Sequence, residues 1–388
     1  MLALMIWLVA VAAHRALLTH PVIVSSRDVE DRHQLMAQGL AGDLLLGAAV
    51  SALVAAAGLA IGAAGERLGV LMLALSPWIV CLLVQDYWRA MAFNERRPGL
   101  ALANDLVFAA VQGAALTLLL MLGWRSSPWI IAAWGLGATA GAVLGFLWFG
   151  AASSLAEGWH AVGRLWPLSR WMLADSATAF TSDQAYLAFV AFLLSHVDYG
   201  GFRAAASLMG PVIVILHAGA NIGLPEASRR WDPGDPAALQ RFARRLTTWT
   251  SFCIALYGTG IALGGRSLLR ALYGPEFAHY DALAVLAALQ YFIGTSAFGQ
   301  EIALKAAGRM RRLWRMRLVV AGASLVSAAG FVWWLGTIGA GWAGVFTAAY
   351  LVAGVYLVYR AELGRPATTD RQELSNRQRK ILSWRYPA

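Results

Sequence analysis

The chain has 388 residues, of which 59% are hydrophobic and only 13% are charged, and its formal net charge is +10. Because a soluble domain carries about 25% charged residues, this composition excludes an ordinary water-soluble globular protein. A positive net charge is also typical of nucleic-acid-binding proteins. Here, however, the basic residues lie in short segments between long apolar runs, as they do in membrane proteins. The composition therefore predicts a polytopic membrane protein that contacts membrane lipids and not nucleic acid.

Long apolar runs occur from end to end of the chain. A membrane-spanning helix needs about 20 mostly apolar residues, whereas a membrane β-strand needs about 9–11 with alternating polarity. The runs are long and do not alternate, which predicts an all-α fold. We expect about eleven transmembrane helices, near residues 2–24, 44–62, 68–84, 106–123, 128–150, 171–194, 204–224, 247–263, 282–299, 318–335 and 338–359.

The lysines and arginines are distributed unevenly among the connecting segments. Of the 31 in the chain, 25 lie in alternate loops and the C-terminal tail, 5 lie in the intervening loops, and Arg15 lies within the first apolar run. Since basic residues concentrate on the cytoplasmic side, the tail is predicted to be cytoplasmic. The high Ala, Gly and Arg content, with only two lysines, indicates a bacterial genome rich in G and C. We therefore expect a multi-pass protein of the bacterial cytoplasmic (inner) membrane.

The longest central loop predicts a division into two lobes. We expect an N-lobe of about five helices over residues 1–150, an inter-lobe cytoplasmic loop over 151–170 and a C-lobe of six helices over 171–360. A basic cytoplasmic tail over 361–388 is predicted to be either solvated or in contact with anionic lipid headgroups. The charge pattern places the start of the first run outside, which predicts a twelve-helix protein that lacks helix one.

Short sequence echoes between the two halves favour an internal duplication. Each echo falls in a corresponding span of its half. The pairs are Arg15-Ala16 with Arg203-Ala204, residues 21–24 with 211–214, and Gln85-Asp86 with Gln300-Glu301.

Motifs of common enzyme classes are absent from the sequence. It has no HExxH, P-loop, GxSxG or paired-carboxylate motif. Cys81 and Cys253 are far apart and lack metal-ligand spacing, and the histidines are scattered. The protein is therefore predicted not to be an enzyme and to need no cofactor.

Polar residues inside the predicted spans are costly and mark candidate functional positions. Arg15 lies within the first span and should face a wet cavity or a partner acid, unless it only marks the end of a short helix. Span six carries seven polar residues between Asp175 and Gln184, including Asp183. Its carboxylates and hydroxyls suit a small cation or a proton, or else polar pairing with neighbouring helices. Glu301 and Lys305 are spaced to pair on one helix face.

Several short motifs resemble those of one transporter superfamily. Tyr273-Gly274-Pro275-Glu276-Phe277 resembles a turn of polysaccharide flippases. Leu224-Pro225 followed by Ser228-Arg229-Arg230 is similar to the end of their eighth helix. The segments at 85–89, 96–98 and 104–105 look like a connection between their fourth and fifth helices. The flippases belong to the multidrug/oligosaccharidyl-lipid/polysaccharide (MOP) exporters, whose MATE-like fold has twelve helices in two lobes.

The resemblance implies that the protein flips polyprenyl-pyrophosphate-linked saccharides across the membrane for envelope polysaccharide or O-antigen synthesis, together with polysaccharide assembly proteins. The anionic headgroup of such a cargo requires cations, for which Arg15 and Arg203 are the candidates. Asp175 and Asp183 are the candidates for ion coupling, with Na+ or H+ as the coupling ion. Two alternatives stay open: export of drugs or metabolites by the same fold, and a non-transporting scaffold of polysaccharide assembly.

Overall fold

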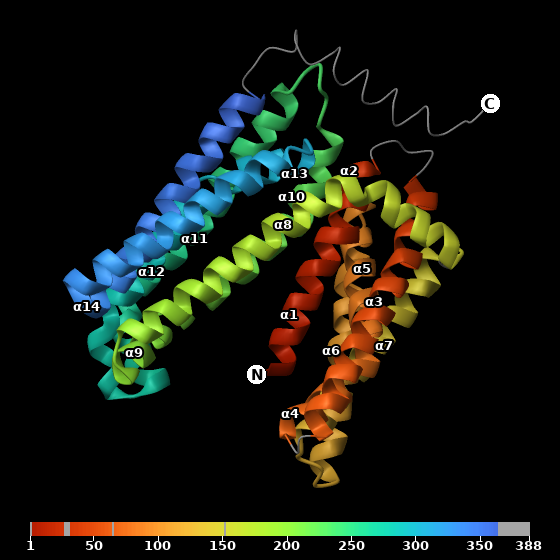
Figure 1. The fold of residues 1–388 in the computed structure, drawn as a ribbon, viewed down its shortest axis with the longest axis horizontal. Helices are drawn as coiled ribbons and strands as arrows, with labels where there is room; N and C mark the ends of the chain where they lie inside the picture. Colours follow the sequence, from red (N-terminus) through yellow and green to blue (C-terminus); the bar gives the residue numbers. More distant parts are fainter. Residues whose placement is uncertain (1, 27–31, 64–65, 151–152, 364–388) are drawn as a thin grey trace. The chain divides into compact units, whose positions relative to one another are not determined.

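The computed structural model describes residues 2–26, 32–63, 66–150 and 153–363. Within these ranges all regular structure is helical (Figure 1). The elements in chain order are α1 (Leu2–His14), the π-helical segment η1 (Arg15–Thr19), α2 (His20–Ser25), α3 (Arg32–Ala63), α4 (Arg67–Leu75), η2 (Ser76–Trp78), α5 (Ile79–Asn94), α6 (Pro98–Met121), α7 (Ser127–Phe149), α8 (Leu155–Leu193), α9 (His196–Ser207), α10 (Gly210–Arg229), α11 (Ala237–Tyr273), η3 (Pro275–Tyr280), α12 (Asp281–Thr295), α13 (Phe298–Ala306) and α14 (Met310–Leu363).

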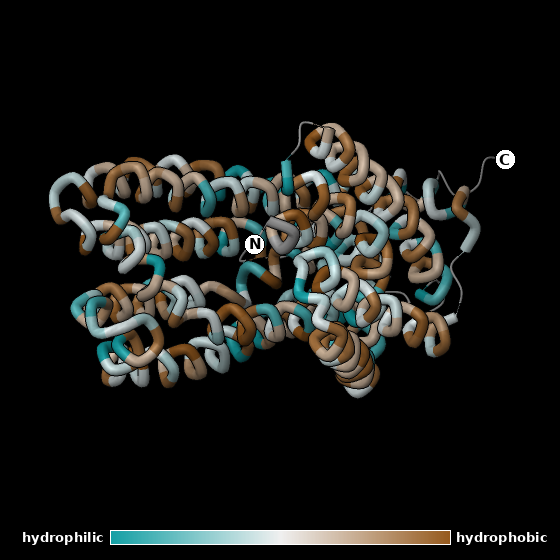
Figure 2. Tube along the Cα trace, turned by 90° about the horizontal axis from the view of Figure 1, so that it is seen from below, coloured by the Kyte–Doolittle hydropathy of each residue, from teal (hydrophilic) through white to brown (hydrophobic). Residues whose placement is uncertain are grey.

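Eight of the described helices are long and apolar enough to cross a membrane, and the pair α9 and α10, bent by 45°, forms a ninth span. α14 is a hairpin of two helices, because Gly336 interrupts it with non-helical dihedral angles and Phe331 of the first arm stacks on Phe346 of the second. α8 is long enough to cross a membrane but is not apolar enough to count as a span by composition. The described chain thus confirms the predicted all-α membrane fold, and hydrophobic residues recur along the helices of both units (Figure 2).

The helices form two compact units that divide between Ser176 and Ala177, within α8. In the first unit, α7 packs through a face of small residues, since all but one of its buried positions are glycine or alanine. Such faces let helix backbones approach closely in a membrane. Trp88 of α5 lies against this face, where it stacks on Phe149 with ring centroids 5.1 Å apart. The close approach also brings polar groups of α5, α6 and α7 together.

In the second unit, α11, α12 and α14 lie side by side (Figure 1), and an apolar core fills the space between α9, α10, α11 and α12. Met209, Ile254 and Leu269 are among its fully buried side chains. Gly299 of α13 lies directly against the backbone of α11 at Ala243, and its amide donates to a threonine hydroxyl of α11. α13 is thereby fixed with its polar residues turned toward the interior of the unit.

Two predicted segments differ from the structure. Residues 155–170 were expected to lie in a loop, but they form the first part of α8. α3 begins at Arg32 and not near residue 44, because hydropathy detects only the apolar part of a longer amphipathic helix. The basic tail lies outside the described residues from position 364 onward.

Gly336 generates a first prediction, because its φ of 59° and ψ of −134° suit only glycine. Gly336→Ala should lower the free energy of unfolding by about 1–3 kcal/mol through backbone strain. Gly330→Ala is the matched control, since Gly330 lies within the same helix with no atom within 4 Å of an added Cβ; it should be neutral or stabilising by up to about 1 kcal/mol. Thermal unfolding in detergent measures both, and equal midpoints would contradict a glycine-dependent hairpin.

Candidate functional site

A buried ion pair joins the start of the first unit to α5. Arg15 donates from Nε to Oδ2 of Asp86 at 2.8 Å and from Nη2 to Oδ1 at 2.6 Å. The Asp86 side chain is 3% exposed and that of Arg15 is 22% exposed. This two-point geometry is the strongest that a guanidinium and a carboxylate can adopt. The expectation that Arg15 meets a partner acid is confirmed.

His14 lies next to this pair and is completely buried. Its Nδ1 is 2.5 Å from Oδ1 of Asp43, and its Nε2 is 2.9 Å from the Thr19 hydroxyl and 3.6 Å from Oδ2 of Asp86. The π-helical turn that begins at Arg15 places these side chains, since a π turn rotates the following residues relative to an α-helix; such turns recur at functional sites. The imidazole therefore lies between two buried carboxylates.

The network continues through α5 and α6 to α7. Arg89 donates to Asp86 at 2.5 Å and lies 4.0 Å from Asp105. Gln85 donates to Asn104 at 2.8 Å, and Asn104 donates to the carbonyl oxygen of Gly141 at 2.7 Å. In total the network holds two arginines and three aspartates. It therefore carries one negative charge when His14 is neutral and none when His14 is protonated.

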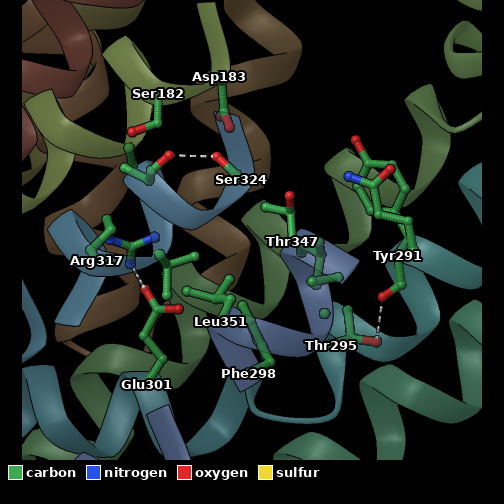
Figure 3. Close-up of a pocket in the computed structure, with 17 residues that line it drawn as sticks. Ser182, Asp183, Tyr291, Thr295, Phe298, Glu301, Arg317, Ser324, Thr347 and Leu351 are labelled. Atoms are coloured by element: carbon green, nitrogen blue, oxygen red, sulfur yellow. Dashed lines mark hydrogen bonds and ion pairs between the residues drawn. The ribbon is translucent and has the colours of Figure 1, made fainter. Parts of the chain in front are cut away.

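The second unit has a partly open cavity of about 310 Å³ that is lined by both apolar and polar side chains (Figure 3). Its walls come from α8, α10, α12, α13 and both arms of α14. The polar side chains that line it are Ser182, Asp183, Gln290, Tyr291, Thr295, Glu301, Arg317, Ser324 and Thr347. Polar side chains that gather at one cavity inside an apolar bundle are costly and therefore mark a candidate binding site.

The two carboxylates of the cavity differ in how they are compensated. Glu301 accepts from Arg317 at 3.0 Å and lies 2.7 Å from the ammonium nitrogen of Lys305, so two cations offset its charge. The predicted pairing of Glu301 with Lys305 is confirmed, and Arg317 joins it. Asp183 makes no hydrogen bond or ion pair with the parts of the chain that the structure describes. The positive charge of Arg317 attracts the Asp183 carboxylate through space. Because a buried carboxylate without a direct partner is unfavourable within a membrane, a bound cation, a proton or water is needed to satisfy its oxygens.

The hydroxyl groups around the cavity are oriented to accept rather than to donate. Ser182 donates to the carbonyl oxygen of Thr178 at 2.6 Å, Ser324 to that of Ala321 at 2.8 Å, and Thr347 to that of Ala343 at 2.8 Å. Each hydroxyl hydrogen is thus used by its own helix, which leaves oxygen lone pairs for the cavity. Oxygen lone pairs beside a carboxylate suit a hard cation. No group of three or more His, Cys, Asp or Glu side chains is positioned to hold a metal ion among the described residues.

The predicted site residues take different positions. Asp183 lines the cavity of the second unit, whereas Asp175 is buried in the first unit, where it has an interaction partner. Arg15 belongs to the buried network of the first unit. Arg203 is exposed on α9 and does not line the cavity.

The roles of Asp43 and Asp86 were not predicted from the sequence. Asp43 precedes the predicted span at 44–62, but α3 begins eleven residues before it. Asp86 was noted in the echo of Gln300-Glu301 and in the flippase-like segment 85–89, but not as a site residue. An isolated aspartate within the apolar residues 79–84 and 87–88 was the signal that could have identified Asp86.

Comparison with known proteins identifies the fold. No protein-family model and no curated protein sequence matches the chain. Among solved structures, a mutant MATE protein is similar with a TM-score of 0.77 and 12% identity, over 93% of this chain and 86% of that chain. A mutant of the Vibrio cholerae MATE transporter VcmN gives 0.74 and 13%, over 93% and 87%. An outward-facing multidrug resistance MATE transporter of the MOP superfamily gives 0.68 and 14%, over 93% and 86%. The chain therefore has a MATE-like fold.

The buried network predicts an asymmetric response to mutation. Asp86→Asn should destabilise the protein by about 3–5 kcal/mol, because it leaves Arg15 buried without its partner charge. The double variant Arg15→Gln/Asp86→Asn should recover part of this loss. Arg97→Gln, which removes a surface arginine 3.8 Å from Glu95, is the control and should cost less than about 1 kcal/mol. Thermal unfolding in detergent checks these variants together with Arg15→Gln alone. Additive effects of Arg15→Gln and Asp86→Asn in the double variant would show that the pair is not coupled.

Proposed function

We propose that the protein is an ion-coupled transporter, and not an enzyme, that flips lipid-linked oligosaccharides across the bacterial cytoplasmic membrane for envelope polysaccharide synthesis. The observation that carries the transport proposal is the polar cavity of the second unit with the unpaired carboxylate of Asp183. The MATE-like fold supports the proposal, since the solved structures of that fold named above include transporters.

Ion coupling requires that the free energy of the bundle differ between the cavity with a bound cation or proton and the empty cavity. A cation or proton at Asp183 adds a direct partner to a carboxylate that the empty cavity leaves without one, so its binding and release alter the electrostatic free energy of the bundle. The lone pairs of Ser182, Ser324 and Thr347 are available as further ligands for Na+. Protonation of the carboxylate would serve the same purpose for H+. Asp175 is the second candidate for this role, and its buried position favours the structural alternative.

Recognition of an anionic headgroup is assigned to arginine. Asp86 uses two of the five guanidinium donors of Arg15, so the remaining donors can bind a pyrophosphate oxygen from the exposed side. Arg203 is exposed and can serve the same purpose. The saccharide cargo is favoured over drugs or metabolites by the flippase-like turn at Tyr273–Phe277, in which Gly274 has a positive φ of 113° before the η3 segment.

Orientation provides one test. In a background with Cys81→Ser and Cys253→Ser, a cysteine at Arg311 should react with a membrane-impermeant maleimide only after the cells are permeabilised, because the charge pattern places the α13–α14 turn inside. A cysteine at Ser126, in the α6–α7 turn, should react in intact cells. The reverse pattern would overturn the predicted orientation.

The coupling role of Asp183 is tested in proteoliposomes with a fluorescent polyprenyl-pyrophosphate-linked saccharide. In the wild type, an imposed Na+ or H+ gradient should accelerate flipping. In Asp183→Asn the rate with the gradient should equal the rate without it, since the amide carries no charge to compensate. Asp232→Asn removes an exposed carboxylate of the α10–α11 turn and should behave like the wild type.

The response of folded Asp183→Asn protein to the ion gradient shows whether the carboxylate is structural or couples the ion to transport. If Asp183→Asn melts at a lower temperature but keeps the wild-type response, the coupling proposal is wrong. Flux of small organic cations without flux of the saccharide would favour the export of drugs or metabolites. The absence of both fluxes would favour the scaffold.

A further inference from the structure

A basic groove lies where α10 ends and α11 begins. Its volume is about 470 Å³, and its lining includes Arg230, Arg241, Arg245, Phe242 and Trp249. Arg230 is anchored there, because its guanidinium lies 4.5 Å from the Phe242 ring centroid and 2.7 Å from Glu226. The charge distribution predicts this end of α11 to be cytoplasmic. None of these residues belongs to the cavity of Figure 3.

The two α11 arginines that line the groove do not pair with acidic groups. Arg241 and Arg245 are exposed and make no ion pair with the described residues. The nearby acids are engaged elsewhere: Glu226 also binds Arg229 at 2.9 Å. Asp232 and Asp235 accept from the backbone amides of Gly234 and Ala237 within their own turn. The groove therefore presents unneutralised positive charge.

An exposed apolar stripe continues from these arginines along the same helix. Residues 241, 245, 249, 252 and 256 are spaced by three or four positions and so share one face of α11. Trp249, Phe252 and Leu256 on that face are 67%, 59% and 69% exposed. The rings of Trp249 and Phe252 contact each other edge to face at 6.4 Å. One helix face thus changes from cationic, through an interfacial tryptophan, to apolar.

We propose that this face binds one anionic phospholipid of the surrounding leaflet, with its phosphate between Arg241 and Arg245 and an acyl chain along Trp249, Phe252 and Leu256. The order of chemistry along the helix matches the order along such a lipid: anionic headgroup, interfacial region, hydrocarbon. Tryptophan is favoured at the headgroup level, and basic pockets on the cytoplasmic side bind anionic headgroups. A free phosphate would use the arginines but has no need of the apolar stripe.

Native mass spectrometry of the detergent-purified protein, titrated with phosphatidylglycerol, tests the proposal. Arg241→Gln/Arg245→Gln should weaken retention of the lipid about 30-fold, at about 1 kcal/mol for each arginine. Arg266→Gln/Arg270→Gln is the matched control, because it removes the same charge from the far end of α11; it should bind like the wild type. Trp249→Ala should weaken retention without a change in charge, and thermal unfolding verifies that each variant is folded.

Competition between ligands distinguishes a bound phospholipid from bound inorganic phosphate. The wild type should retain phosphatidylglycerol in preference to phosphatidylcholine, and inorganic phosphate should not displace it. Equal retention by the Arg241/Arg245 variant and the Arg266/Arg270 control would overturn the proposal, as would equal retention of the two lipids. If inorganic phosphate displaced the lipid and Trp249→Ala had no effect, the groove would be a site for free phosphate and the phospholipid proposal would be wrong. Should the double variant not fold, Arg245→Gln alone is expected to weaken retention about fivefold.

Discussion

The ion pair between Arg15 and Asp86 is the constraint on which the first unit depends. A membrane-spanning bundle offers no water to screen a charge, so each ionised side chain must meet an opposite charge or reach a polar cavity. The pair satisfies this requirement and, in doing so, fixes the π-helical turn η1 against α5. That position in turn holds His14 between two carboxylates. The small-residue face of α7 then closes on the network from the other side.

The second unit also neutralises a partly buried acid with two cations. Asp86 is held by Arg15 and by Arg89, three residues beyond it, while Glu301 is held by Arg317 and by Lys305, four residues beyond it. In each unit an acid that follows a glutamine binds one cation from its own helix and one from another helix. This shared geometry extends the sequence echo into three dimensions and supports the duplication of the two halves.

The sequence predicted the elements that depend on hydrophobicity and local spacing. The adjoining spans 318–335 and 338–359 place the turn of the α14 hairpin around Gly336, and Glu301 with Lys305 follows from helix periodicity alone. It could not predict contacts between distant helices, such as Asp86 with Arg15 or Arg317 with Glu301, because one sequence does not specify which faces meet. It also underestimated helix length at α3, since the amphipathic turns outside the apolar run carry no hydropathy signal.

Ion coupling requires that a cation or a proton bind the unpaired carboxylate of Asp183 during part of the transport cycle. The most direct measurement is equilibrium binding of radioactive Na+ to the purified protein, together with proton release or uptake at constant pH, without any cargo or gradient. We predict one saturable cation or one exchanged proton per chain, and its loss in Asp183→Asn but not in Asp232→Asn. Neither saturable Na+ binding nor proton exchange in the folded wild type would contradict it.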